Sequence, residues 1–265
     1  KQSKAMHLLG RKAKYRMILT GTPITQNPLD FYSQYLFLDG TIFGNNYYSF
    51  RNNYAVMGGY NDKQIVKYVN LGDLVRKAHS VAWRVTKEQA LDLPEQIDQM
   101  RYCELEPAAR KEYDRLARDG LAMLKGIGVV KPLNVLSQLL RLSQFAGGFM
   151  SSSEGTEYKV SNAKMSLLEE TLNDLIDAGK KCVIFARFVP EILAINELCA
   201  KLDMSPALIY GATRQCHRGG EMARFQTDDK CRAFVGQLQA CGLGITLHAA
   251  DTAIFYSYDY SFANY

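Results

Sequence analysis

The feature that most constrains the fold is a regular alternation of apolar strands and amphipathic helices from residue 163 onward. The predicted strands are KCVIFARF, PALIYG, CRAFVGQ and TAIFYSYD, and the predicted helices 163–178, 190–202 and 214–226 precede the first, second and third of them. Continuous apolar strands that alternate with helices are typical of a parallel sheet covered on both faces. Such a sheet binds ligands at the carboxyl ends of its strands. We therefore expect an α/β fold whose functional edge is formed by the turns after these strands.

Composition and charge exclude several classes of protein. Of the 265 residues 47% are hydrophobic and 22% are charged, which is close to the globular average and excludes disordered and collagen-like chains. No stretch approaches the roughly 18 to 20 apolar residues that span a bilayer, and the first residues lack the apolar core of a secretion signal. We expect a cytoplasmic protein without a membrane partner. The net charge of +5 is compatible with a polyanionic ligand without proving one.

The cysteines and histidines do not predict a metal site. The six cysteines contain no C-x-x-C pair, which argues against a zinc site or a disulfide framework. We expect reduced, mostly packed thiols. The four histidines, His7, His79, His217 and His248, also lack the spacing of metal ligands.

The first part of the chain predicts a mixture of helices and short extended segments. Pro28 begins a helix with apolar residues at helical spacing, and Asp39-Gly40 ends it. Pro107 fits the first position of a helix in an all-helical insert at about 100–160. The remaining predictions are a helix at 3–14, strands YRMILT and DQMRYCELE, a helix then a loop in NNYYSFRNNYAVMGGYND, helices PAARKEYDRLARDGLAML and PLNVLSQLLRLSQFA, and an exposed loop SSSEGTEYKVS.

A turn of unusual composition follows the predicted strand YRMILT. Thr20, Gly21, Thr22 and Pro23 deliver two hydroxyl groups and a conformationally free glycine to the end of that strand. This arrangement fits a switch loop. An ordinary β-turn whose threonines bond their own backbone fits equally well.

The segment QACGLGITLHAAD, residues 239–251, is a second candidate site. Gly242 and Gly244 leave backbone N–H groups open to a phosphate oxygen, and Thr246 and His248 add polar groups. The alternative is that the glycines serve only the geometry of the strand exit. The chain contains no G-x-x-x-x-G-K-[ST] pattern, so it cannot cradle a triphosphate in the P-loop manner.

Two further strand ends carry basic side chains. Arg187 and Phe188 follow VIFA, and a cation beside an aromatic ring can bind phosphate or stack on a base. A surface salt bridge is the alternative for a lone arginine. After PALIYG, Thr213 is a predicted N-cap, and Arg218 lies in the first turns of the following helix.

Taken in order, these segments resemble the sucrose-non-fermenting (Snf) type ATPases of helicase superfamily two. RMILTGTPITQNPLDFYSQYLFLDGTIFG resembles motif III and its following landmarks, and WRVTKEQALDLPEQ resembles the stretch with an Arg, a Thr-Lys and a Leu-Pro. KCVIFARF is similar to motif IV, YGATRQCHRGGEMARFQ to the segment after it, and ACGLGITLHAADTAIFYSYDYSF to motif V. The likeness covers nearly the whole chain.

The resemblance implies two RecA-like lobes with ATP and Mg²⁺ between them and double-stranded DNA across both. Thr20–Pro23 would couple the lobes, and Gly242, Gly244 and Thr246 would contact nucleotide. The family commonly has Gly-Gly where this chain has Cys241-Gly242, Asn at Thr246 and a small polar residue at His248. The residues that it implies for DNA are Arg187, Phe188, Thr213, Arg218, Gln239 and His248.

The resemblance also predicts a fragment of a longer enzyme. Residues 1–78 would be the end of lobe one, and residues 79–265 would be lobe two. Walker A and the Asp-Glu box would precede Lys1, and motif VI with its arginine fingers would follow Tyr265. We therefore expect a missing ATP-binding half of the first lobe, no tightly bound cofactor, and no ATP hydrolysis by this chain alone. A non-catalytic module for DNA or partner binding and an RNA helicase fragment are the alternatives.

Overall fold

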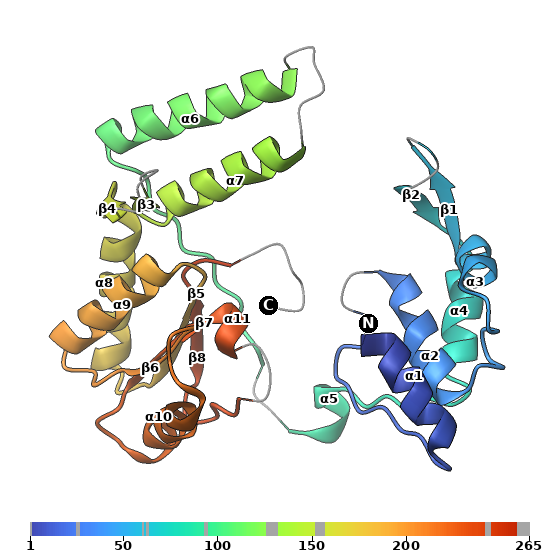
Figure 1. The fold of residues 1–265 in the computed structure, drawn as a ribbon. Helices are drawn as coiled ribbons and strands as arrows, with labels where there is room; N and C mark the ends of the chain where they lie inside the picture. Colours follow the sequence, from blue (N-terminus) through green and yellow to red (C-terminus); the bar gives the residue numbers. More distant parts are fainter. Residues whose placement is uncertain are drawn as a thin grey trace. The chain divides into compact units, whose positions relative to one another are not determined.

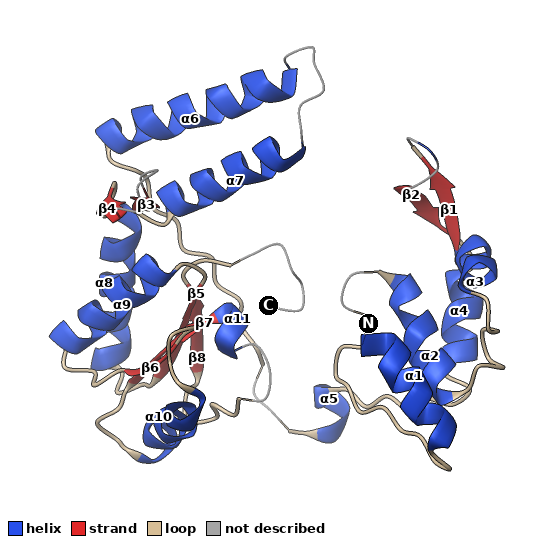
Figure 2. Cartoon of the chain, in the orientation of Figure 1, coloured by secondary structure: helices blue, strands red, loops and turns tan. Residues whose placement is uncertain are grey.

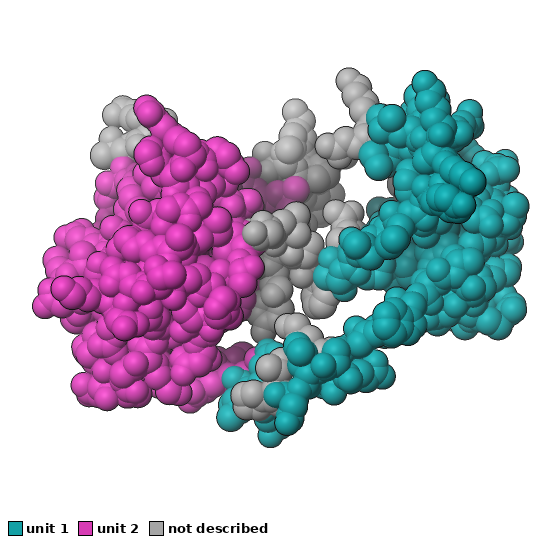
Figure 3. Space-filling model, turned by 90° about the horizontal axis from the view of Figure 1, so that it is seen from below, with its two compact units in different colours: residues 1–97, 261–263 teal, residues 98–260, 264–265 magenta. Residues whose placement is uncertain are grey.

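The computed structural model describes residues 2–24, 27–59, 61, 64–92, 95–125, 132–151, 157–241 and 245–258. The described chain divides into two compact units between Ile97 and Asp98 (Figure 3). Each unit has a hydrophobic core of its own. None of the described helices is long and apolar enough to cross a membrane.

The second unit is built on a parallel sheet, as the alternation of strands and helices predicted. Its strands are β5 (Cys182–Ala186), β6 (Ala207–Ile209), β7 (Ala233–Gln237) and β8 (Thr252–Phe255), in the spatial order β6-β7-β5-β8. All three pairings are parallel, and Ile184 at the centre of β5 lies opposite Val235 on one side and Ile254 on the other. The predicted α/β fold is therefore confirmed (Figure 2).

Both faces of this sheet are covered. Helices α8 (Ala163–Asp177) and α9 (Val189–Lys201) pack on the face that carries Ile184 and Val235 (Figure 1). Helix α10 (Gln215–Thr227) and the segment 245–250 pack on the opposite face, against Val183 and Phe234. Burial on both faces is the reason why the strands read as continuous apolar runs in the sequence.

The predicted insert contains a helical hairpin and ends in two short strands. Helices α6 (Pro107–Lys125) and α7 (Pro132–Ala146) lie side by side, and each begins with proline (Figure 1). Strands β3 (Phe149–Ser151) and β4 (Glu157–Lys159) then form an antiparallel pair. The sequence predicted an exposed loop there, because three-residue strands are too short to give a visible alternation.

The first unit has a core of aromatic side chains. Its elements are α1 (Gln2–Lys12), η1 (Pro28–Asp30), α2 (Phe31–Leu38), α3 (Tyr47–Tyr54), β1 (Ala55–Gly58), β2 (Gln64–Tyr68), α4 (Leu71–Ala78) and α5 (Lys87–Ala90). Tyr32, Phe50 and Tyr54 are buried. The centroid of the Phe50 ring lies 5.2 Å from that of Tyr32 and 4.9 Å from that of Tyr54. The Asn27 side chain accepts from Leu29 N at 3.0 Å, which fixes the start of η1.

Two predicted strands are absent from the described residues. Residues 15–20 and 98–106 form no hydrogen-bonded ladder, and Met17 and Leu19 are 74% and 88% exposed. A strand needs a partner strand as well as an apolar sequence, and the described part of the first unit pairs only β1 with β2. The segment after α3, predicted as a loop, contains β1, and helix α4 was not predicted.

Candidate functional site at the carboxyl edge of the sheet

Four turns of the second unit lie along the carboxyl edge of the parallel sheet. They follow β5 at Arg187, β6 at Tyr210, β7 at α11 (Leu238–Cys241), and β8 at Tyr256. Because parallel strands end at the same edge, residues far apart in the sequence meet there. Most of the residues predicted to bind DNA lie in three of these turns.

Gln237, at the end of β7, joins two of the turns. Its Nε2 donates to the Arg187 carbonyl at 3.3 Å, and its Oε1 accepts from Gly211 N at 2.8 Å. Both hydrogen-bonding groups of one amide are therefore used to hold the turns after β5 and β6 on either side of β7. Sequence reasoning missed Gln237, although a polar residue that ends an apolar strand is a usable signal.

Arg187 and Phe188 form a compact pair. The guanidinium lies over the Phe188 ring at 5.2 Å from the centroid, and both residues are half-buried. Arg187 N donates to Ser257 Oγ at 2.8 Å, so the turn after β5 is tied to the end of β8. Within the described residues no carboxylate forms an ion pair with Arg187, so the salt-bridge alternative finds no support there.

Thr213 and Arg218 hold the turn after β6. Thr213 Oγ1 accepts from Tyr210 N at 3.1 Å, which closes this turn. The prediction that Thr213 caps α10 is wrong, because the hydroxyl points back to Tyr210 and the N-cap residue is Arg214. Arg218 Nε donates to the Thr213 carbonyl at 3.2 Å, and its Nη1 donates to the Ala240 carbonyl at 3.3 Å. Arg218 therefore joins this turn to α11.

The motif V candidates are only partly described. Gly242 and Gly244 lie outside the described residues. The Thr246 carbonyl accepts from Gln226 Nε2 at 2.6 Å, and His248 Nδ1 lies 3.2 Å from the same nitrogen. Gln226 belongs to the last turn of α10, the end that leads to the start of β7. The structure therefore does not bring Thr246 and His248 into the group around Gln237, whereas exposed Gln239 lies beside it on α11.

The Thr20–Pro23 turn belongs to the first unit. Thr20 Oγ1 accepts from Thr22 N at 3.1 Å, and the Pro23 carbonyl accepts from Gln34 Nε2 at 2.6 Å. The first contact is the local bond that an ordinary turn would make. No other part of the described chain lies within 4 Å of a Cβ built at Gly21, so packing there does not require glycine.

Two cysteines of the second unit are buried and unreactive. Burial raises the pKa of Cys241 to about 11 and that of Cys182 to about 12, so both thiols stay protonated at neutral pH. Among the described residues, no group of three or more His, Cys, Asp or Glu side chains could hold a metal ion. These residues therefore offer no all-protein cage for a metal ion.

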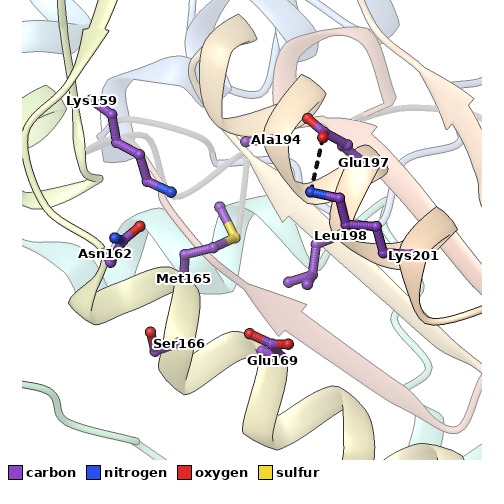
Figure 4. Close-up of a pocket in the computed structure, with 9 residues that line it drawn as sticks. All are labelled: Lys159, Asn162, Met165, Ser166, Glu169, Ala194, Glu197, Leu198 and Lys201. Atoms are coloured by element: carbon purple, nitrogen blue, oxygen red, sulfur yellow. Dashed lines mark ion pairs between the residues drawn. The ribbon is translucent and has the colours of Figure 1, made fainter.

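A hollow of about 390 Å³ lies between α8 and α9, away from the residues named above. Met165 and Leu198 line it with apolar surface. An ion pair between Lys201 Nζ and Glu197 Oε1, 2.9 Å apart, lies at its border (Figure 4). None of the predicted site residues that the structure describes lines this hollow, and we assign it no function.

Two family models match the chain. Residues 1–154 match the SNF2-related domain, and residues 163–265 match the helicase conserved C-terminal domain. The first match covers more than half of the chain.

The curated relatives are distant and much longer. An uncharacterized ATP-dependent helicase of Mycoplasma genitalium is 24% identical over 92% of this chain and 23% of its own length. Protein CHROMATIN REMODELING 4 of Arabidopsis thaliana is 25% identical over 98% of this chain and 12% of its own length. The chain thus spans less than a quarter of these relatives.

Two solved structures of SWI2/SNF2 ATPase cores are also similar to the chain. The Sulfolobus solfataricus SWI2/SNF2 ATPase core in complex with dsDNA is 25% identical, with a TM-score of 0.54 over 97% of this chain and 55% of that chain. The SWI2/SNF2 ATPase core domain of the same organism is 26% identical, with a TM-score of 0.54 over 92% of this chain and 51% of that chain.

Proposed function

The chain belongs to the SNF2-related family, and from this premise we propose that it is the C-terminal part of an ATP-dependent double-stranded DNA translocase or remodeller. In this proposal residues 79–265 form the second RecA-like lobe, and residues 1–78 end the first. The protein would act on DNA in the cytoplasm, in a nucleoid or its nuclear equivalent. Strand separation is not part of the proposal.

The observation that carries the proposal is the group of turns around Gln237. It holds Arg187, Phe188, Thr213 and Arg218 at one edge of the sheet through hydrogen bonds to their backbone and side chains. The Arg187 guanidinium rests on the Phe188 ring, which leaves its N–H groups for phosphate oxygens. Arg218 keeps N–H donors beyond the two that bind carbonyl groups. Gln239 beside this group, and His248 outside it next to Gln226 at the end of α10, complete the proposed DNA contacts.

The nucleotide contacts in this proposal come from the family. Gly242, Gly244 and Thr246 would face nucleotide, and Thr20–Pro23 would couple the nucleotide state to the grip on DNA. The described residues contain no group of three or more His, Cys, Asp or Glu side chains that could hold a metal ion, and the sequence has no P-loop. ATP and Mg²⁺ would therefore be held mainly by the first-lobe half of the parent protein, and we derive no hydrolytic step for this chain.

The DNA proposal is tested by the salt dependence of binding. The 265-residue chain should bind duplex DNA with an affinity that falls steeply with salt, because phosphate contacts release counterions. Arg187→Ala should weaken binding to all sequences and lower the salt slope by about one. The matched control is Lys201→Ala, an exposed cation at the other end of α9 that pairs with Glu197. It should leave the slope unchanged.

Two outcomes would contradict the proposal. Binding that is insensitive to salt would show that the chain makes no phosphate contacts, and the proposal depends on such contacts. Equal or tighter binding to duplex RNA of the same length would favour an RNA helicase fragment instead.

A further inference from the structure

A fully buried carboxylate lies at the Arg187–Phe188 turn, and the proposed function gives it no role. Glu191, in the first turn of α9, has no exposed surface. Its Oε2 accepts from Phe188 N at 3.4 Å and from the hydroxyl of Ser257. The same hydroxyl oxygen accepts from Arg187 N at 2.8 Å. One carboxylate therefore holds both residues of the turn, one directly and one through Ser257.

The carboxylate also meets the base of the helical insert. A Cβ placed on Gly147, just after α7, would overlap Glu191 Oε1, so a side chain there would displace the buried carboxylate. The Gly147 carbonyl accepts from the Tyr256 hydroxyl at 3.0 Å. Tyr256 and Ser257 are adjacent at the end of β8. The insert and the edge of the sheet therefore share one small polar cluster.

The two ends of the insert are joined to each other as well. Glu106, just before α6, accepts from Ser161 Oγ at 2.6 Å and from Asn162 N at 2.9 Å, just before α8. Gly148 has a φ of +93°, and a Cβ there would lie 2.7 Å from the Ser161 carbonyl. These contacts fix the point where the insert leaves the sheet, so its base has a defined position.

Packing alone does not account for a carboxylate at this place. Burial raises the pKa of Glu191, while Ser257 and the charge of Lys164 oppose that rise. The Lys164 ammonium itself lies over the Tyr256 ring at 4.8 Å from the centroid. Within the described residues, Glu191 Oε1 has no hydrogen-bond partner. Burial of such a group costs stability that an apolar side chain would not cost.

We propose that Glu191 is a positioning residue that holds the Arg187–Phe188 turn in place against Ser257 and the base of the helical insert. Glu191 does not contact DNA itself. It fixes the backbone from which the Arg187 guanidinium and the Phe188 ring extend. The DNA readout of this inference rests on the proposed function, whereas the position of the turn can be measured without DNA.

The DNA experiment compares salt slopes in the 265-residue chain. If Glu191 acts through Arg187, Glu191→Ala should lower the slope by about one, as Arg187→Ala does, and the double variant should lower it no further. Affinity at low salt should fall by about tenfold, the value of one charge-assisted hydrogen bond. A variant that is merely less stable reduces the active fraction and leaves the slope unchanged.

Three further variants sharpen the comparison. Glu191→Gln keeps an acceptor oxygen and should restore binding to within about twofold of the parent chain. Ser257→Ala breaks the link to Arg187 N and should behave like Glu191→Ala. The matched control is Glu197→Ala on the same helix, whose carboxylate is exposed and paired with Lys201. It should change neither slope nor affinity.

Amide hydrogen exchange decides the inference independently of DNA. Glu191→Ala and Ser257→Ala should speed exchange at Arg187 and Phe188, while Glu197→Ala should not. If the parent chain fails to bind duplex DNA, the proposed function fails, and exchange still tests the positioning. Unchanged exchange together with an unchanged slope would overturn the inference. If Glu191→Ala does not fold, Ser257→Ala carries both measurements.

Discussion

Gln237 shows how a single side chain can organise a site from residues that the chain visits far apart. It bonds to the Arg187 carbonyl, 50 residues earlier, and to Gly211 N, 26 residues earlier. Neither partner could be chosen from the sequence, because both bonds depend on β7 lying between β5 and β6. The Gln237 amide therefore acts as a spacer, meaning that its hydrogen bonds link the two turns at the sheet edge and fix the distance between them.

Replacement of Gln237 by alanine should loosen these turns. We expect Gln237→Ala to lower the free energy of unfolding by about 1 kcal/mol, because two hydrogen bonds are lost at a half-buried position where water can replace part of them. Chemical denaturation measures the change. Gln239→Ala, two residues further on and exposed, is the control and should shift stability by less than about 0.5 kcal/mol. Equal effects would show that Gln237 is no spacer.

At the residue scale, the sequence was a better guide to which side chains lie at the carboxyl edge of the sheet than to the hydrogen bonds that hold them there. Arg187, Phe188 and Arg218 were chosen because they follow apolar strands, and in the structure they lie at the carboxyl edge. Their roles in binding stay predictions. Glu191, Ser257 and Gln237 were missed, since a carboxylate in an amphipathic helix and a hydroxyl after a strand look like surface residues until the strand order is known.

At the scale of elements, the helical spacing of apolar residues and the positions of proline were sufficient to predict the bounds of the long helices. Helices α6 to α10 begin and end within about two residues of their predicted bounds, because proline marks three of their starts and apolar residues repeat at helical spacing. Strands in the parallel sheet were found by their apolar runs. Residues 15–20 share that composition but lie without a partner strand in the described chain. Pairing is a property of the fold and not of the segment.

Gly147, just after α7, and Gly220, inside α10, should respond oppositely to replacement by alanine. Gly147→Ala should destabilise the chain by about 1 to 3 kcal/mol, because its Cβ would displace the buried Glu191 carboxylate. Gly220→Ala should stabilise α10 by about 0.5 to 1 kcal/mol, because no side chain lies within 4 Å and glycine is costly inside a helix.

Thermal or chemical unfolding of the two variants measures both the expected loss of stability in Gly147→Ala and the expected gain in Gly220→Ala. Gly219→Ala is a second helical control, with open space around its Cβ position. A stabilised Gly147→Ala variant would contradict the close packing of α7 against Glu191 and, with it, the shared cluster at the base of the insert.

At the scale of the whole molecule, the family was evident before the fold. The resemblance rested on short motifs in a fixed order, and the matches to the SNF2-related domain and the helicase conserved C-terminal domain confirm it. The order of motifs survives where overall identity is only 24 to 25%. Domain limits are harder to predict, because the compact units divide after Ile97 while the proposed lobe boundary follows residue 78. The boundary of lobe two stays a proposal.

The whole chain should bind DNA without turning over ATP. The sequence holds no P-loop lysine motif, and the described residues offer no cluster of carboxylates for Mg²⁺. An arginine finger alone is worth about 10³ to 10⁵ in rate, and the chain has no assigned residue for that role. Phosphate release from the 265-residue chain, measured with and without duplex DNA, should therefore stay at background.

Thr246→Ala provides the control, because turnover from a contaminating ATPase would persist in that variant. DNA-stimulated turnover that disappears in Thr246→Ala would show that this chain completes an ATP site by itself, and it would overturn the proposed division of labour between the lobes.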